Sequence, residues 1–312
     1  MKLAFVFPGQ GAQAVGMGRD LYDNSPAARA VFDAVDSATG FSVSALCFDG
    51  PDEKLKETKN TQPALYAVSV AALAACKESG IVPSAVAGHS VGEYAALQAA
   101  GAIGIATGAK LVAARGEAMA IAATQNPGAM AVVLGLDTGA IIEACRETNL
   151  IGVVVAANLN APGQVVISGE DRAVNAVSER LKTQGAKRIL PLAVSGAFHS
   201  PLMEWAAVEL RDVFANAEIS APDLPIIANV TADYETTADE IRANLSAQVA
   251  GPVRWIETIE RLTADDYTTF VECGPGTVLA GLIKRIAPGA VTYSVGDMAG
   301  LAKAKEALVG GS

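Results

Sequence analysis

Ser90 lies in the motif Gly-His-Ser-Val-Gly, which covers residues 88–92. The apolar run at 82–87 predicts a strand before the motif, and the alanine-rich segment at 93–100 predicts a helix after it. A Gly-X-Ser-X-Gly motif between a strand and a helix is typical of a nucleophile elbow, a tight turn that exposes the serine oxygen. Because the chain contains 30 glycines, the motif by itself fits an ordinary glycine-rich turn equally well.

A nucleophilic serine needs a base, since an alcohol is barely ionised at neutral pH. The chain has only two histidines. His89 directly precedes Ser90, so its side chain should point away from the serine and support the turn. His199, in the sequence Ser-Gly-Ala-Phe-His-Ser-Pro at 195–201, is therefore the predicted base. The alternative is a structural histidine in the core.

Enzymes of this type usually orient the histidine with a carboxylate. The candidates by residue type are Asp233, Glu235, Asp239 and Glu272, and each is more typical of a surface or loop carboxylate. The order of residues in the chain nominates none of them. A serine–histidine pair held by a neutral hydrogen-bond acceptor therefore stays open.

Two further features could act on a substrate. Arg115 follows three small apolar residues on a predicted helix, where its guanidinium could bind a carboxylate through two parallel hydrogen bonds. An ion pair with Glu117 or Glu93 is an equally good interpretation. The glycine-rich loop at 8–13 matches neither a dinucleotide-binding fingerprint nor a P-loop, and its N–H groups could instead face the site of Ser90.

The composition excludes several classes of protein. With 312 residues the chain can bury a large core, and its net charge of −10 argues against a nucleic-acid partner. No apolar stretch reaches the roughly 18 residues of a membrane span, and the first residues lack the features of a signal peptide. Scattered cysteines without paired spacing predict neither disulfides nor a zinc site, so we expect a cytoplasmic protein. These cysteines are Cys47, Cys76, Cys145 and Cys273.

The elements that must position these residues form a predicted α/β fold. The larger domain, residues 1–125 and 196–312, should contain a mainly parallel sheet and resemble the α/β-hydrolases. Its predicted helices cover 20–40, 61–79, 107–123, 201–217 and 238–249, with a last helix after the Cys-Gly-Pro-Gly sequence at 273–276. Its predicted strands cover 3–7, 225–230 and 268–272, and residues 53–59 should form a charged, solvated segment. Residues 126–195 show the order strand, helix, strand, strand, helix, strand, which predicts an inserted ferredoxin-like subdomain.

Five motifs occur in an order that resembles a known family. They are residues 7–13, residues 88–93, Arg115-Gly116, residues 196–200, and Gln248 ahead of a Pro-Val-X-Trp sequence at 252–255. Over essentially its whole length the chain is similar to the malonyl-CoA:acyl carrier protein transacylases of bacterial fatty-acid synthesis. The acyltransferase domains of polyketide synthases look similar, so supply of a polyketide carrier protein is the alternative.

The resemblance implies a set of catalytic roles. Ser90 would carry a malonyl ester, and His199 would act as general base and then general acid. The backbone carbonyl of Gln248 would orient His199. The backbone N–H groups of Gln10 and Val91 would form the oxyanion hole, and Val91 stands where leucine is common in the family.

The resemblance also implies how the substrates bind. Arg115 would pair with the malonyl carboxylate, Asn158 and Asn160 would lie on the thioester side, and Phe198 would limit the room beside the substrate. Family members that use methylmalonyl groups have smaller residues at that place. The substrates would be malonyl-CoA and acyl carrier protein, with no metal and no cofactor, and we expect a monomer. A serine esterase and a non-catalytic docking subunit are the less favoured alternatives.

The acyl carrier proteins are acidic as a family, so the resemblance predicts a basic docking surface despite the negative net charge. Lys182, Lys187 and Arg188 cluster around the last helix–strand junction of the inserted subdomain. We expect this patch at the mouth of the cleft, where charge complementarity would speed association. A solvated surface without a partner is the alternative interpretation.

Overall fold

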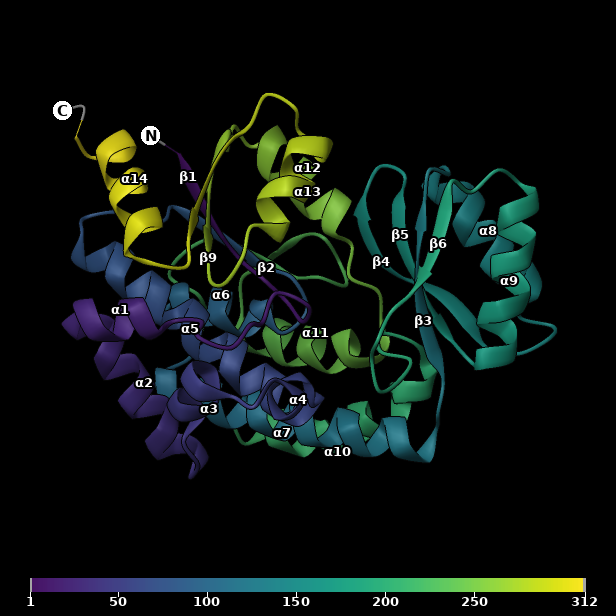
Figure 1. Ribbon diagram of the computed structural model, residues 1–312, viewed down its shortest axis with the longest axis horizontal. Helices are drawn as coiled ribbons and strands as arrows, with labels where there is room; N and C mark the ends of the chain where they lie inside the picture. Colours follow the sequence, from purple (N-terminus) through teal and green to yellow (C-terminus); the bar gives the residue numbers. More distant parts are fainter. Residues whose placement is uncertain (1, 311–312) are drawn as a thin grey trace.

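Two β-sheets organise the chain, and the computed structural model describes residues 2–310 (Figure 1). The larger sheet has six strands in the order β10-β9-β1-β2-β7-β8, and all neighbouring pairs are parallel except β7 and β8. The strands are β1 (Leu3–Phe7), β2 (Ala85–Gly88), β7 (Ile226–Ile227), β8 (Tyr234–Glu235), β9 (Thr269–Cys273) and β10 (Val291–Val295). The predicted α/β fold with a mainly parallel sheet is confirmed.

Helices cover both faces of this sheet. All five residues of β1 are buried, as expected for a parallel strand that is covered on both sides. Phe5 and Phe7 belong to a core shared with α2 (Pro26–Thr39), α5 (Thr58–Glu78) and α7 (Ile105–Gln125). The alternate residues Ala4 and Val6 pack in a second core with α12 (Trp255–Ala264) and α13 (Val278–Ile286).

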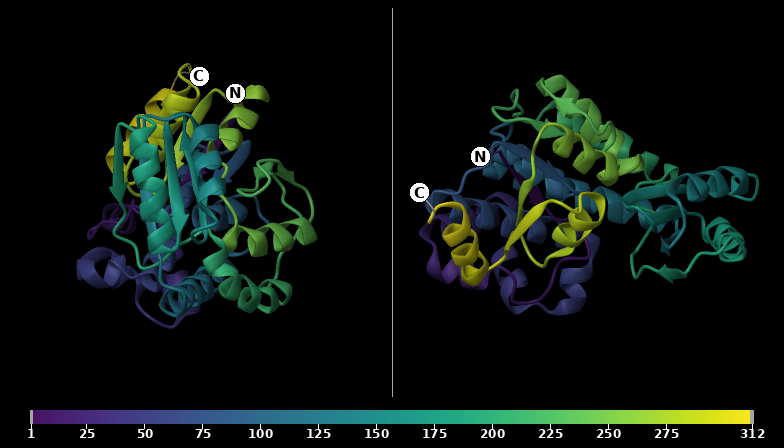
Figure 2. Two further views of the ribbon diagram at one scale, coloured as in Figure 1. Left: turned by 90° about the vertical axis from the view of Figure 1, so that its right-hand side faces the viewer. Right: turned by 90° about the horizontal axis from the view of Figure 1, so that it is seen from above.

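The smaller sheet has four antiparallel strands in the order β4-β5-β3-β6. Its elements are β3 (Ala129–Leu134), α8 (Thr138–Thr148), β4 (Val154–Ala161), β5 (Gln164–Gly169), α9 (Asp171–Thr183) and β6 (Arg188–Pro191). This is the predicted ferredoxin-like subdomain, and it projects from the larger domain with α8 and α9 on its outer side (Figures 1 and 2). The domain boundaries at 126 and 195 stay a prediction.

Several element boundaries differ from the sequence predictions. The predicted helix at 20–40 is two helices, α1 (Arg19–Asn24) and α2, because Ser25 is extended and caps α2 ahead of Pro26. The segment at 53–59, predicted to be charged and solvated, contains most of α4 (Asp52–Lys56), whose Leu55 is buried, and α5 begins at Thr58 rather than at 61. The predicted strand at 225–230 shortens to the two residues of β7.

The remaining helices complete the larger domain. They are α3 (Val43–Asp49), α6 (Gly92–Ala99), the 3-10 turn η1 (Pro201–Met203), α10 (Glu204–Ala215), α11 (Ala238–Ala250) and α14 (Met298–Leu308). The sequence predictions did not include α3, α12, β10 or α14. Within residues 2–310 no individual helix has the length and apolar character to cross a membrane, although the bent pair α2–α3 meets both criteria when taken together.

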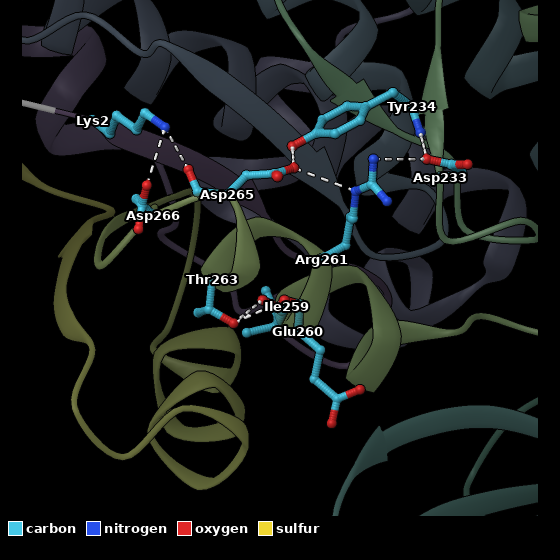
Figure 3. A network of polar contacts seen from close by, with 9 residues as sticks. All are labelled: Lys2, Asp233, Tyr234, Ile259, Glu260, Arg261, Thr263, Asp265 and Asp266. Atoms are coloured by element: carbon cyan, nitrogen blue, oxygen red, sulfur yellow. Dashed lines mark hydrogen bonds and ion pairs between the residues drawn. The ribbon is translucent and has the colours of Figure 1, made fainter.

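A polar network fastens the edge strand β8 to the end of α12 (Figure 3). The Tyr234 hydroxyl donates to Asp265 over 2.7 Å, and Arg261 lies 3.3 Å from Asp265 and 3.6 Å from Asp233. Lys2 donates to the backbone carbonyl of Asp265 over 2.6 Å, which ties the start of β1 to the same corner. Asp233, one of the four candidates for orienting the histidine, therefore serves this peripheral network.

Candidate active site

The serine turn has the predicted geometry of a nucleophile elbow. Ser90 follows β2 and precedes α6, and its φ of 53° lies in the left-handed region, which is strained for a residue with a side chain. A Cβ atom at Gly88 would lie 2.0 Å from the backbone of Gly92, and one at Gly92 would lie 2.1 Å from the Phe7 carbonyl. Gly88 therefore allows the tight turn into α6, and Gly92 allows the turn to approach the end of β1.

His199 lies against the serine. Its Nε2 atom is 2.7 Å from the Ser90 hydroxyl, and its Nδ1 atom is 2.9 Å from the Gln248 carbonyl and 3.1 Å from the Gly251 carbonyl. Carbonyl oxygens only accept, so we assign the imidazole proton to Nδ1 and leave Nε2 free to accept from the serine. Burial, reinforced by the positive charge of Arg115, lowers the pKa of His199 to about 3, so the ring is a neutral base at physiological pH.

No carboxylate completes this pair among the four candidates. Asp233 and Asp239 are exposed. Glu235 and Glu272 are buried, so their interpretation as surface or loop carboxylates is wrong. Glu235 accepts from Asn244 over 2.9 Å, and the carboxylate of Glu272 accepts from the first N–H groups of α13. The open alternative, a histidine held by a neutral acceptor, is the arrangement that the structure contains.

Arg115 on α7 reaches the same serine and is only 1% exposed. Its Nη2 atom donates to the Ser90 hydroxyl over 3.1 Å and to the Gln248 side-chain oxygen over 2.8 Å. Its Nη1 atom donates to the side-chain oxygen of Gln62 over 2.6 Å. A glycine at position 116 allows α7 to approach α5, since a Cβ there would lie 2.9 Å from the backbone of Lys59.

Arg115 has no ion-pair partner within residues 2–310. Glu117 is exposed, and Glu93 is close enough to influence the Arg115 charge but forms no hydrogen bond or ion pair with it, so neither predicted ion pair is present. A buried guanidinium without a carboxylate is costly, because its charge has lost water and gained only neutral acceptors. The arrangement is therefore suited to receiving a negatively charged group.

The predicted oxyanion-hole residues lie beside the serine. Gln10 and Val91 both line the cavity that contains Ser90. In the described part of the chain, neither backbone N–H group donates to a protein acceptor. Gly9 holds the loop against the elbow, because a Cβ atom there would lie 2.6 Å from the His89 carbonyl. Two N–H groups at such a site suit a developing oxyanion.

The cavity has a volume of about 460 Å³ and is lined by loops and helices of the larger domain and by strands of the smaller sheet. Met130, Val132 and Asn158 contribute from the smaller sheet, and Phe198, which is 5% exposed, directly precedes the histidine. Asn160 lines the same cavity, and its side-chain oxygen lies 2.8 Å from Nε2 of His89. The His89 ring also packs edge-on against Trp255, so this histidine supports the turn as expected.

Three side chains that the sequence analysis did not assign to the site hold its parts together. Asn229 accepts from the backbone N–H of Ser90 over 2.7 Å and donates to the Gly88 carbonyl over 2.6 Å. Glu93 accepts from Asn229 and from Gln248, and Gln62 accepts from Arg115. Within residues 2–310 no cluster of His, Cys, Asp and Glu side chains is arranged to hold a metal ion.

Comparison with known proteins identifies relatives over nearly the full length. Residues 4–306 match the family model described as the acyl transferase domain. The chain is 46% identical over 297 residues to the malonyl CoA-acyl carrier protein transacylase of Bacillus subtilis (strain 168), covering 95% of this chain and 94% of that protein. It is 41% identical over 306 residues to the protein of the same name from Escherichia coli (strain K12), covering 98% and 99%.

Solved structures agree with this assignment. The malonyl CoA-acyl carrier protein transacylase of Coxiella burnetii superposes with a TM-score of 0.96 at 39% identity, covering 99% of this chain and 98% of that one. A malonyl-transacylase solved in complex with a type II polyketide synthase acyl carrier protein superposes with a TM-score of 0.95 at 42% identity, covering 98% and 100%. The predicted resemblance is confirmed, and the chain belongs to the acyl transferase domain family, among the malonyl-CoA:acyl carrier protein transacylases.

Proposed function

We propose that this protein transfers a malonyl group from malonyl-CoA to the phosphopantetheine thiol of an acyl carrier protein, in fatty-acid synthesis. One observation carries the choice of acyl group: the buried guanidinium of Arg115 has no carboxylate partner among residues 2–310 and lies 3.1 Å from the Ser90 hydroxyl. A malonyl carboxylate bound there would bring the thioester at the other end of the same short acyl group to the serine. A simple esterase would have no use for such a cation.

In the first half-reaction, the Ser90 oxygen attacks the thioester carbonyl while Nε2 of His199 takes the hydroxyl proton. The carbonyl electron pair moves to oxygen, and the resulting oxyanion accepts hydrogen bonds from the backbone N–H groups of Gln10 and Val91. Collapse of this intermediate breaks the carbon–sulfur bond. The proton on His199 passes to the departing CoA thiolate, which leaves a malonyl ester on Ser90.

The second half-reaction reverses these steps with the carrier thiol as nucleophile. His199 takes the thiol proton, the thiolate attacks the ester carbonyl, the bond between that carbon and the Ser90 oxygen breaks, and the proton returns to the Ser90 oxygen. Only protons and electron pairs move, and the side chains named here supply each transfer. We therefore propose that the reaction needs no resident cofactor or metal. We also expect the protein to be a cytoplasmic monomer.

The remaining cavity residues would set substrate orientation. We propose that the Gln248 carbonyl keeps the His199 ring facing the serine, and that Phe198 closes the space beside the malonyl methylene. Asn158 and Asn160 line the same cavity as the serine, where their amide groups would suit the polar pantetheine arm. Asn160 already contacts His89, so its contribution would include support of the elbow.

Intact-mass spectrometry tests this function in two stages. Enzyme mixed with malonyl-CoA should gain the mass of one malonyl group, and the Ser90→Ala variant should gain none. Addition of phosphopantetheinylated acyl carrier protein should then move the mass increase to the carrier. An adduct on the Ser90→Ala variant would overturn the serine assignment, and release of free malonate without transfer to the carrier would favour a hydrolase.

A further inference from the structure

Glu93 bonds to residues around Ser90 but does not line the cavity that contains the serine. It stands in the first turn of α6, three residues after the nucleophile, and its side chain is completely buried. One oxygen, Oε2, accepts from the backbone N–H of Asn229 over 3.0 Å and from the side-chain nitrogen of Gln248 over 2.9 Å. The two partners are the two amide residues that contact Ser90.

These contacts fix which way the Gln248 amide faces. Its nitrogen donates to Glu93 and to the Ser90 carbonyl, so its oxygen must face the opposite way, toward Nη2 of Arg115 at 2.8 Å. A flipped amide would bring its nitrogen against the guanidinium, two donors facing each other, and would lose all three bonds. The acceptor at Glu93, together with the Ser90 carbonyl, therefore holds the amide oxygen toward Arg115.

The acceptor does not need to be charged. Burial and the neighbouring carboxyl of Glu235 raise the pKa of Glu93 well above its ordinary value, which favours the neutral acid. The other charged or titratable groups around it are Tyr94 on the same helix and Arg115 on α7. A neutral carboxylic acid still offers a carbonyl oxygen that accepts two N–H groups, and so does a glutamine amide.

We propose that Glu93 is a positioning residue for substrate selection, which acts through the Gln248 amide to hold the Arg115 guanidinium at Ser90. The inference rests on the proposed function and deepens it. It predicts that loss of the acceptor weakens the preference for an acyl group with a free carboxylate, whereas loss of the charge alone does not. A residue that only stabilised the fold would lower the amount of folded enzyme and leave that preference intact.

The test compares kcat/KM for malonyl-CoA and acetyl-CoA, with the active enzyme counted by the acyl-enzyme burst and folding checked by thermal unfolding. The variants are Glu93→Ala, which removes the acceptor, and Glu93→Gln, which keeps it. Glu235→Ala is the matched control, because it truncates another buried glutamate that bonds to Asn244 and not to Gln248. Arg115→Ala and the double variant with Glu93→Ala complete a double-mutant cycle.

We expect Glu93→Ala to lower the malonyl-to-acetyl ratio about tenfold or more, because a misplaced guanidinium loses its paired hydrogen bonds to the carboxylate. Glu93→Gln and Glu235→Ala should stay within about threefold of the wild-type ratio, and the double variant should match Arg115→Ala. An unchanged malonyl-to-acetyl ratio in Glu93→Ala would overturn this inference and leave the proposed function intact. The same holds if the ratio falls as far in Glu93→Gln as in Glu93→Ala. A wild-type enzyme without a malonyl preference would overturn the proposed function, and the inference with it.

Discussion

The Nδ1 atom of His199 lies 2.9 Å from the backbone carbonyl of Gln248, and this contact replaces the carboxylate of a serine–histidine–acid triad. A carbonyl fixes the ring orientation as a carboxylate does, but it carries no full negative charge to stabilise an imidazolium. Arg115 and burial also act against the protonated ring. In the proposed mechanism His199 would therefore hold a proton only briefly, between serine and leaving thiol, and stay neutral at rest.

The low pKa of His199 predicts that the rate of acyl-enzyme formation does not fall at mildly acidic pH. The ring serves as base only when it is neutral, so activity is present above its pKa and is lost as the pH falls through that value, which lies at about 3. We expect the rate of acyl-enzyme formation to stay constant between pH 8 and roughly pH 5. Rapid-quench measurements followed by intact-mass analysis would record this rate.

Acetyl-CoA provides the control for this profile, because it has no free carboxylate that titrates. Acyl-enzyme formation from acetyl-CoA should therefore show the same plateau. A decline seen only with malonyl-CoA would reflect titration of the substrate carboxylate and not of His199. A midpoint between pH 6 and 7 with both donors, the ordinary range for histidine, would contradict the assignment of a neutral, strongly desolvated base.

Phe198 should exclude branched donors. It is buried, lines the cavity and directly precedes the histidine, so an added methyl group on the substrate would meet its ring. One methyl group in an apolar pocket is worth about 1–3 kcal/mol, so methylmalonyl-CoA should be roughly ten- to two-hundred-fold poorer than malonyl-CoA. Phe198→Ser should reduce that gap, and Phe198→Leu should lie between. If both donors lose kcat/KM in equal proportion in these variants, Phe198 acts on folding rather than on specificity.

The basic patch on the smaller subdomain should affect the carrier step alone. Lys182 pairs with Glu179, whereas Lys187 and Arg188 form no ion pair within the described residues. None of the three lines the cavity, but Lys187 shares a neighbouring hollow with Arg285, which donates to the cavity residue Gln164. Changing Lys182, Lys187 and Arg188 to glutamate should raise KM for the carrier, mainly at low salt, because complementary charges act on association.

Lys303→Glu is a suitable control for the patch, since α14 lies at the opposite end of the molecule (Figure 1). Self-acylation by malonyl-CoA should be unchanged in every variant. Equal loss in both half-reactions, or an equal effect of the control, would exclude docking at this patch.

The sequence predicted the residues whose chemistry is local. Five consecutive residues between a predicted strand and a predicted helix identified the elbow. His199 was identified by elimination, because the chain has only two histidines. The ferredoxin-like order was also visible, because each of its elements has its own clear pattern. The break at Ser25 had a signal as well, a capping serine before a proline, which outweighed the helical periodicity on both sides.

The side chains that hold the serine and the arginine in place were not predictable in the same way. Glu93 and Gln248 are 155 residues apart, and Asn229 bonds to Ser90 across 139 residues. Nothing in the local sequence says that a glutamate in the first turn of a helix will point inward or that an amide from another helix will meet it. Only the tertiary arrangement of α6, α7 and α11 brings these side chains together, and it decides which polar residues become buried.

The ratio of kcat/KM for malonyl-CoA to that for acetyl-CoA tests the central claim most directly, when measured in wild type, Arg115→Lys and Arg115→Ala. A buried carboxylate needs a paired partner, and a guanidinium provides two parallel hydrogen bonds where an ammonium provides a point charge. We therefore expect a strong malonyl preference in wild type, substantial impairment of malonyl transfer in Arg115→Lys, and loss of the preference in Arg115→Ala, with acetyl gaining relative to malonyl. A malonyl-to-acetyl ratio in Arg115→Ala equal to that of wild type would contradict the claim that this arginine selects the acyl group.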